Sequence, residues 1–194
     1  QHAMATIEQD AVCIVRQSYT GETGFDLIAP RASLKKIAGK LAAIGKPFSA
    51  AWVGEQALDI LRVEAGIPRH GVDFTEDHLL LEVGIDHAVS FTKGCYLGQE
   101  VVERIRSRGH VNKKLCGLLL EGRNPAKSGD KLYSGQKEIG VVTSSVLSPR
   151  LERPIALGYV NKDFWEPGTE LLVGRDTGAI RATVTRLPFV APLE

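Results

Sequence analysis

The chain has 194 residues, 43% hydrophobic and 24% charged, which are the proportions of a globular protein with one ordinary domain or two small ones. Its 24 basic and 23 acidic residues leave a formal net charge of +1, which excludes an overall attraction to nucleic acid or to a membrane surface. Three widely spaced cysteines, with no Cys-x-x-Cys or histidine-rich spacing, argue against a disulfide framework and against a metal site. Because the sequence shows no signal peptide and no apolar run of membrane-spanning length, we expect a cytoplasmic protein.

The first part of the chain predicts a β-hairpin. Residues 1–4 resemble the scar of a protease site followed by an initiator methionine, and we leave them out of the fold prediction. Residues 12–18 are rich in β-branched side chains, and residues 25–28 resume the same pattern. Gly21 and Gly24 lie between the two runs, so we expect a turn there.

Two helices and two shorter elements follow the hairpin. Apolar residues recur at helical spacing between Pro30 and Gly45 and again over residues 53–65. We expect both apolar stripes to pack in a core. A short strand is predicted at residues 88–91 and a third helix at residues 99–107.

Beyond residue 112 the sequence alternates short β-like runs with turns rich in Gly, Pro, Asn and Ser. The runs cover residues 115–120, 139–143, 155–159, 170–173 and 182–185. This spacing predicts a small all-β barrel or sandwich. The predicted fold is therefore α+β, with an α/β domain over residues 5–111 and a C-terminal all-β barrel over residues 112–194.

Residues 93–100, Lys-Gly-Cys-Tyr-Leu-Gly-Gln-Glu, form the most distinctive stretch of the sequence. Gly94 and Gly98 permit a tight turn, and Cys95 precedes the predicted third helix with Lys93 two residues away. A helix N-terminus and an ammonium both favour a thiolate, so we predict that Cys95 is reactive. The alternative is an inert cysteine buried in a loop.

The segment from residue 93 to residue 114 carries six basic and two acidic residues, a local excess of four positive charges. A solvated helix face explains this excess, and so does an acidic partner such as RNA or a polyglutamyl tail. The segment has few aromatic residues, which argues against base stacking and hence against nucleic acid.

The motif at residues 93–100, with Arg-Gly-His-Val-Asn-Lys-Lys at residues 108–114, resembles the signature of YgfZ-type folate-binding proteins in the glycine-cleavage T-protein superfamily. Further stretches similar to T-proteins lie at residues 19–26, 61–66, 140–144 and 155–160. The resemblance covers residues 11–190 and implies a T-protein-like middle domain followed by the barrel. It does not include the superfamily's N-terminal region, which would precede residue 5.

The resemblance implies tetrahydrofolate, or a derivative, as the ligand. It assigns folate binding to Tyr19, Glu22, Asp26 and Arg62. A carboxylate accepts hydrogen bonds from the ring N–H and the amino group of a pterin at once, and the T-protein acceptor falls on Asp26. Tyr19 would border the ring, and Arg62 would pair with the glutamyl carboxylate. Asp26 is one methylene shorter than the Glu of T-proteins, and Leu58 stands where they have a second arginine.

Each of these residues also has a structural interpretation. Asp26 and Glu22 are ordinary surface acids if the hairpin faces solvent, and Tyr19 is a core aromatic if it faces inward. Arg62 forms a structural ion pair in this interpretation, with Glu64 as the expected partner.

The resemblance leads to three hypotheses of function. The first is a tetrahydrofolate-binding accessory factor for iron–sulfur cluster assembly or repair, in which Cys95 contacts a transient, shared cluster or a partner protein. The second is a folate-dependent aminomethyltransferase, an enzyme of the transferase class. The third is a non-catalytic fragment that recognises another protein.

Overall fold

A computed structural model of the chain describes residues 2–7, 9–85, 88–90, 92–96, 98–100, 102–103, 111–175 and 178–191. Its contacts divide the chain into two units, which we describe separately. Unit 1 runs to Arg62, and unit 2 runs from Val63 to Ala191. The division falls inside one helix, α2 (Glu55–Glu64), whereas the sequence suggested a boundary between residues 111 and 112.

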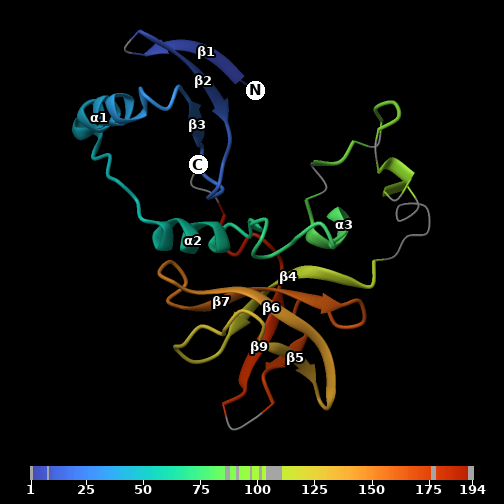
Figure 1. The fold of residues 1–194 in the computed structure, drawn as a ribbon. Helices are drawn as coiled ribbons and strands as arrows, with labels where there is room; N and C mark the ends of the chain where they lie inside the picture. The colour runs from blue at the N-terminus through green and yellow to red at the C-terminus, as the bar shows by residue number, and fades with distance from the viewer. Residues whose placement is uncertain are drawn as a thin grey trace. The chain divides into compact units, whose positions relative to one another are not determined.

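A three-stranded antiparallel sheet opens unit 1, in the order β1-β2-β3 (Figure 1). Its strands are β1 (His2–Ile7), β2 (Asp10–Arg16) and β3 (Phe25–Ile28). The predicted hairpin is confirmed, since Cys13 pairs with Ile28 and Arg16 with Phe25. The residues that we left out as a scar contribute to β1, where His2 pairs with Val15.

The helices of unit 1 are α1 (Leu34–Gly45), a 3₁₀ turn η1 (Lys46–Phe48) and α2. Both α-helices were predicted, but the core role expected of their apolar stripes is wrong for most of the residues. Leu58 and Leu61 of α2 are 41% and 37% exposed. The stripe of α1 is buried only in part. Ile37 is buried, whereas Leu41 and Ile44 remain 41% and 56% exposed. The α1 stripe is present at helical spacing, but the described part of unit 1 does not cover its full width.

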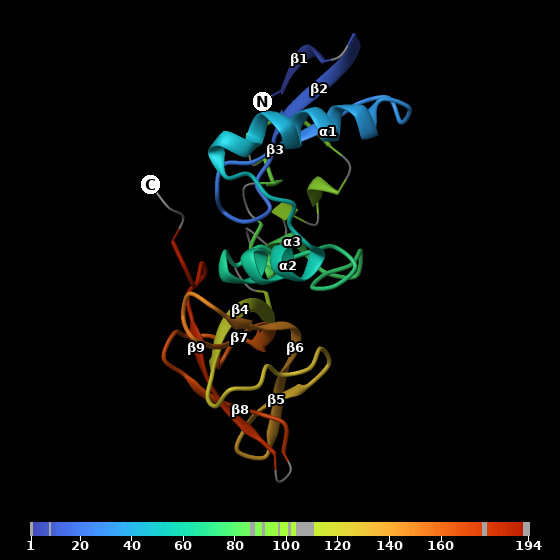
Figure 2. The same cartoon turned by 90° about the vertical axis from the view of Figure 1, so that its left-hand side faces the viewer.

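Unit 2 contains a short helix, α3 (Leu80–Val83), and a closed six-stranded barrel. The strands are β4 (Lys113–Leu120), β5 (Lys131–Ser134), β6 (Lys137–Ser148), β7 (Arg153–Asn161), β8 (Glu170–Val173) and β9 (Ile180–Thr185). Every pairing in it is antiparallel, in the cyclic order β4-β7-β6-β5-β8-β9, which can be followed in Figures 1 and 2. The fold is therefore α+β with a C-terminal barrel, as predicted, but α3 and β5 were missed.

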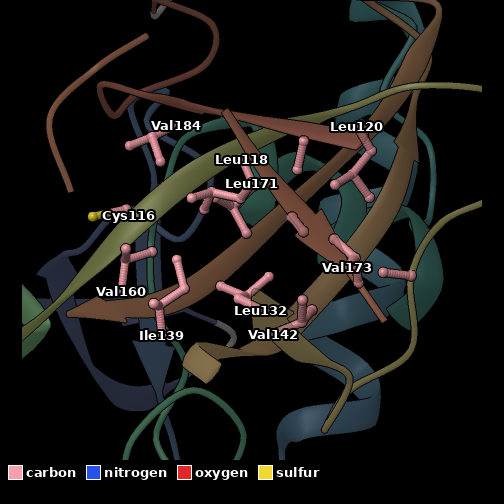
Figure 3. Packing of buried hydrophobic residues seen from close by; sticks show 13 residues of the cluster. Cys116, Leu118, Leu120, Leu132, Ile139, Val142, Val160, Leu171, Val173 and Val184 are labelled. Atoms are coloured by element: carbon pink, nitrogen blue, oxygen red, sulfur yellow. The ribbon is translucent and has the colours of Figure 1, made fainter. Parts of the chain in front are cut away.

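Side chains from all six strands fill the barrel (Figure 3). Leu118, Leu132 and Ile139 are fully buried there. Closure of the barrel brings β6 and β7 so close that a Cβ at Gly140 would overlap the carbonyl oxygen of Tyr159. Glycine is therefore required at this position for steric reasons.

The segment around residues 88–103 differs from the prediction. The strand expected at residues 88–91 is wrong for the described residues 88–90, because Ala88 lies in a 3₁₀ turn and residues 89–90 are irregular, and residue 91 lies outside the described part of the chain. Residues 99–100 and 102–103 are helical, consistent with the start of the predicted third helix, whose last part, residues 104–107, lies outside the described residues. In the part of the chain that the structure describes, no helix is both long and apolar enough to cross a membrane.

Candidate functional site

The loop between β2 and β3 is fixed by its own backbone. Gly21 has a φ of 81°, a conformation that glycine adopts without strain. A Cβ at Gly24 would lie 2.6 Å from the carbonyl oxygen of Gln17, whose N–H donates to the Gly24 carbonyl at 3.1 Å. Ser18 Oγ donates to the carbonyl of Glu22 at 2.6 Å. The loop therefore presents its side chains from a defined backbone.

Tyr19 and Asp26 meet across this loop. The phenol hydroxyl of Tyr19 donates to Asp26 Oδ2 at 3.0 Å, and the tyrosine is 51% exposed. This hydrogen bond, together with the negative charge of Asp26, raises the pKa of Tyr19. Asp26 is partly exposed, and within the described residues the structure gives its second oxygen, Oδ1, no hydrogen-bond partner. The pair thus offers a carboxylate acceptor beside an aromatic ring at the surface.

A hollow of about 320 Å³ lies against the same loop. Arg16, Gln17 and the loop from Gly21 to Gly24 line it. Glu22 belongs to this lining, whereas Tyr19 and Asp26 do not. Of the three hairpin residues predicted to bind folate, the structure brings two into contact and places the third in the wall of a hollow.

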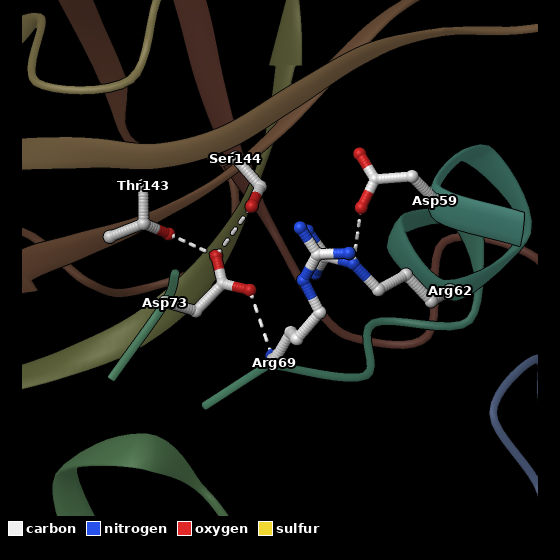
Figure 4. A network of polar contacts seen from close by, with 6 residues as sticks. All are labelled: Asp59, Arg62, Arg69, Asp73, Thr143 and Ser144. Carbon is white, nitrogen blue, oxygen red and sulfur yellow. Dashed lines mark hydrogen bonds and ion pairs between the residues drawn. The ribbon is translucent and has the colours of Figure 1, made fainter. Parts of the chain in front are cut away.

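Arg62, the remaining predicted folate contact, is 5% exposed and lies in α2. Its Nε donates to Asp59 Oδ1 at 2.6 Å, one helical turn earlier, as Figure 4 shows. Glu64, the ion-pair partner expected from the sequence, accepts a hydrogen bond from Ser148 Oγ at 2.5 Å. The structural interpretation of Arg62 thus has a specific partner, Asp59, that the sequence analysis did not name.

Cys95 is the exposed member of the three cysteines. Lys93 lies nearby in the chain, but its ammonium sits 4.6 Å from the ring centroid of Tyr96 in a cation–π contact. Cys13 is partly buried, and Cys116 is buried. Burial raises the pKa of the Cys116 thiol to about 11. Accessibility therefore favours Cys95 as the reacting thiol.

Lys93 and Cys95 belong to unit 2, whereas the hairpin residues and Arg62 belong to unit 1. The predicted site residues are therefore divided between the two units, and each group is described within its own unit. Within the described residues it contains no group of three or more His, Cys, Asp or Glu side chains that could hold a metal ion.

Two buried acids, Glu64 at the end of α2 and Asp73 after it, bind strand β6, a contact that the sequence did not predict. Asp73, 2% exposed, accepts hydrogen bonds from Thr143 Oγ1 at 2.6 Å, Ser144 Oγ at 2.7 Å and the Arg69 N–H at 2.9 Å (Figure 4). Glu64, 3% exposed, accepts a hydrogen bond from the Ser148 hydroxyl. The only sequence signal was that Glu64, Thr143 and Ser144 fall in stretches that resemble T-proteins.

Two family models match consecutive parts of the chain. The GCVT N-terminal domain matches residues 1–93, and the glycine cleavage T-protein C-terminal barrel domain matches residues 113–191. The chain belongs to the glycine cleavage T-protein superfamily.

Curated relatives and a solved structure agree with this assignment. The chain is 32% identical to the aminomethyltransferase of Halothermothrix orenii over 185 residues, which cover 95% of this chain and 52% of the relative. It is 38% identical to the aminomethyltransferase of Rubrobacter xylanophilus over 177 residues, or 91% of this chain and 45% of the relative. The crystal structure of the glycine cleavage system aminomethyltransferase T from Bartonella henselae superposes with a TM-score of 0.84 at 32% identity, covering 93% of this chain and 50% of that one.

The chain spans about half the length of the curated relatives that it matches. These relatives are aminomethyltransferases, which supports the second of our three hypotheses more than the first. The narrower resemblance to YgfZ-type proteins continues to depend on the motif at residues 93–100.

Proposed function

We propose that this chain is the folate-binding part of an aminomethyltransferase of the T-protein type, with tetrahydrofolate or a derivative as its ligand. The observation that carries the proposal is the partly exposed carboxylate of Asp26, one oxygen of which accepts a hydrogen bond from Tyr19. Identity of 32–38% with aminomethyltransferases along nearly the whole chain supports it. Because the chain spans half of those relatives, we propose the transfer reaction for the whole protein and ligand binding for this part.

The recognition chemistry follows from the hydrogen-bonding groups. A pterin presents a ring N–H and an exocyclic amino group side by side, and an ionised carboxylate accepts from both. The hydroxyl of Tyr19 fixes the orientation of the Asp26 carboxylate and leaves Oδ1 available to a ligand. Glu22, in the wall of the adjacent hollow, would accept from a further ligand donor. In this scheme Arg62 stabilises α2 through the hydrogen bond from its Nε to Asp59. A contact between Arg62 and the glutamyl carboxylate of the ligand would use guanidinium nitrogens other than Nε.

A calorimetric titration of the chain with 5-formyltetrahydrofolate tests the proposal. We expect saturable binding that the substitution Asp26→Asn weakens roughly 10-fold or more, because a hydrogen bond to a charged group contributes about 1.5–3 kcal/mol. Tyr19→Phe should weaken binding less, since it removes only the group that orients the carboxylate.

Asp10→Asn is the matched control, because Asp10 is a partly buried aspartate at the start of the neighbouring strand β2. We expect it to leave the affinity unchanged. Equal affinities for the Asp26 and Asp10 variants would reject the role of Asp26. No binding of any reduced folate would favour the third hypothesis, a non-catalytic fragment.

A second candidate function rests on the exposure of Cys95. A solvent-exposed thiol in the motif at residues 93–100 supports the first hypothesis, the accessory role in iron–sulfur cluster assembly or repair. Its partners would be iron–sulfur proteins or their assembly factors. One cysteine cannot hold a cluster alone, so the cluster would need ligands from the partner.

Competitive alkylation with iodoacetamide, followed by mass spectrometry, tests whether Cys95 is the most reactive thiol. We expect Cys95 to be labelled first and Cys116 last, because Cys116 is buried and its pKa is raised to about 11. In cells, Cys95→Ala should lower the activity of iron–sulfur enzymes while Cys13→Ala does not. Normal activity with the Cys95 variant would reject the assembly role.

A further inference from the structure

A second hollow, of about 520 Å³, lies within unit 2 and takes no part in the proposed folate recognition. Its wall comes from short segments that the fold brings together from distant parts of the sequence. The lining residues are Gly66, Pro68 and residues 83–84, 114–116, 165–167 and 185–187. The volume is within the range of small-molecule sites, roughly 300–1,000 Å³.

Part of this wall is apolar and firmly held. Leu115 and Val83 are each 3% exposed, and the Cys116 thiol, which donates to the Lys114 carbonyl at 3.5 Å, is part of the barrel core. Trp165 packs against the same core with one side and lines the hollow. An indole beside aliphatic side chains is suited to the hydrocarbon part of a ligand.

Three charged side chains complete the wall, namely Lys114, Glu166 and Arg186, and all are exposed. The ammonium of Lys114 lowers the pKa of the Cys116 thiol and the carboxylate of Glu166 raises it, so both charges act on the same sulfur. Even so, no ion pair within 4.0 Å joins any of these three side chains to a described residue. Opposite charges thus border one hollow without neutralising each other.

We propose that this hollow binds a zwitterionic amino acid with an apolar side chain. The ligand's ammonium group pairs with Glu166, and its carboxylate pairs with Lys114 and Arg186. The side chain lies against Trp165 and the aliphatic wall. A ligand with both charges bridges the separated groups, whereas one with a single charge leaves part of the wall without a partner.

Tryptophan fluorescence tests the proposal directly. The sequence has two tryptophans, so Trp52→Phe leaves Trp165 as the single reporter in an otherwise intact chain. We expect a saturable fluorescence change with L-leucine. The one-charge analogues 4-methylpentanoate and 3-methylbutylamine should bind at least 10-fold more weakly. Glycine, which has both charges but no side chain, should also bind more weakly.

Variants in the Trp52→Phe background assign the charges. Glu166→Gln and Arg186→Gln should each weaken leucine binding roughly 10-fold, which corresponds to about 1.4 kcal/mol. Glu170→Gln is the matched control, since Glu170 is an exposed acid of the same barrel outside this hollow. Asp26→Asn should leave leucine binding unchanged, so the result is independent of the proposed folate site.

Protection of Cys116 provides a second readout. At pH 9, saturating leucine should slow alkylation of Cys116 several-fold and leave alkylation of Cys95 unchanged. The proposal is overturned if leucine gives no saturable signal, if a one-charge analogue binds equally well, or if Glu166→Gln behaves like Glu170→Gln.

Discussion

The two units of this chain bury very different amounts of apolar surface. In the described part of unit 1 the buried apolar side chains are Val12 and Ile37, whereas the barrel of unit 2 encloses a contiguous cluster. Phe48 and Trp52 of unit 1 are 81% and 77% exposed. Hydrophobic burial is the dominant favourable term in folding, so the barrel supplies most of the stability that is visible in the chain. The carboxylate proposed for ligand recognition lies in the less buried unit.

The largest expected effect comes from removing a side chain at the centre of the barrel. Leu118 is fully buried, and Leu118→Ala should lower the free energy of unfolding by about 2–5 kcal/mol because it leaves a cavity. Leu41→Ala, at a position that is 41% exposed in α1, is the control and should cost less than about 1 kcal/mol. Urea unfolding followed by circular dichroism measures both, and equal losses would contradict the contrast between the units.

The next effect comes from the buried carboxylate that holds the segment after α2. Asp73→Asn should destabilise unit 2 by about 2 kcal/mol, because Asp73 accepts charge-assisted hydrogen bonds from Thr143 and Ser144. Asp130→Asn is the control, since Asp130 is partly exposed and accepts from the Lys127 N–H at 2.8 Å. A smaller loss for Asp73→Asn than for Asp130→Asn would show that this network contributes little.

Cys116 should make the stability of the barrel depend on pH in alkaline solution. Its pKa is about 11 in the folded chain against an ordinary 9.0, so the folded state keeps the proton longer than the unfolded state does. The free energy of unfolding therefore keeps its full value below pH 9 and falls by about 2 kcal/mol as the pH rises towards 11. Cys116→Val should remove this part of the pH dependence, whereas Cys95→Ala should retain it. Urea titrations between pH 8 and pH 11 decide between these outcomes.

The smallest effect concerns the exposed pair in unit 1. The pKa of Tyr19 is raised by its hydrogen bond to Asp26, so the phenol should ionise at a higher pH than an ordinary tyrosine. Asp26→Asn should bring the ionisation of Tyr19 back towards pH 10. The difference in absorbance at 295 nm between the chain and its Tyr19→Phe variant isolates this residue. An identical titration with and without Asp26→Asn would mean that the pair does not persist in solution.

Sequence patterns predicted the helices and strands that have a regular local pattern of apolar and turn residues. The hairpin, α1, α2 and five strands of the barrel have regular apolar spacing and clear turn residues between them. β5 was missed because Lys131–Ser134 is short and has polar ends, and its neighbours β6 and β8 define it by pairing. The strand at residues 88–91 was predicted from a β-like composition, but no described strand pairs with residues 88–90.

The candidate sites were predictable only in part, for the same reason. The resemblance to T-proteins grouped Tyr19 with Asp26, which do form a hydrogen bond. Helix geometry would also have paired Arg62 with Asp59, three residues earlier, sooner than with Glu64, two residues later. By contrast, the contacts of Asp73 join residues 70 and 71 positions apart in the sequence. Local residue spacing does not report contacts over such a long sequence separation.

The hydrogen bonds that Glu64 and Asp73 make with β6 have a practical consequence for dissecting the protein. A truncated chain that begins at residue 113, where the barrel family match starts, would retain all six strands. It would also lack Asp73 and Glu64, which accept hydrogen bonds from three hydroxyls of β6 and lie in the part of the chain that matches the GCVT N-terminal domain. A barrel fragment that folds by itself should therefore start at Val63. A boundary taken from the family matches alone would remove the buried acids that bind β6.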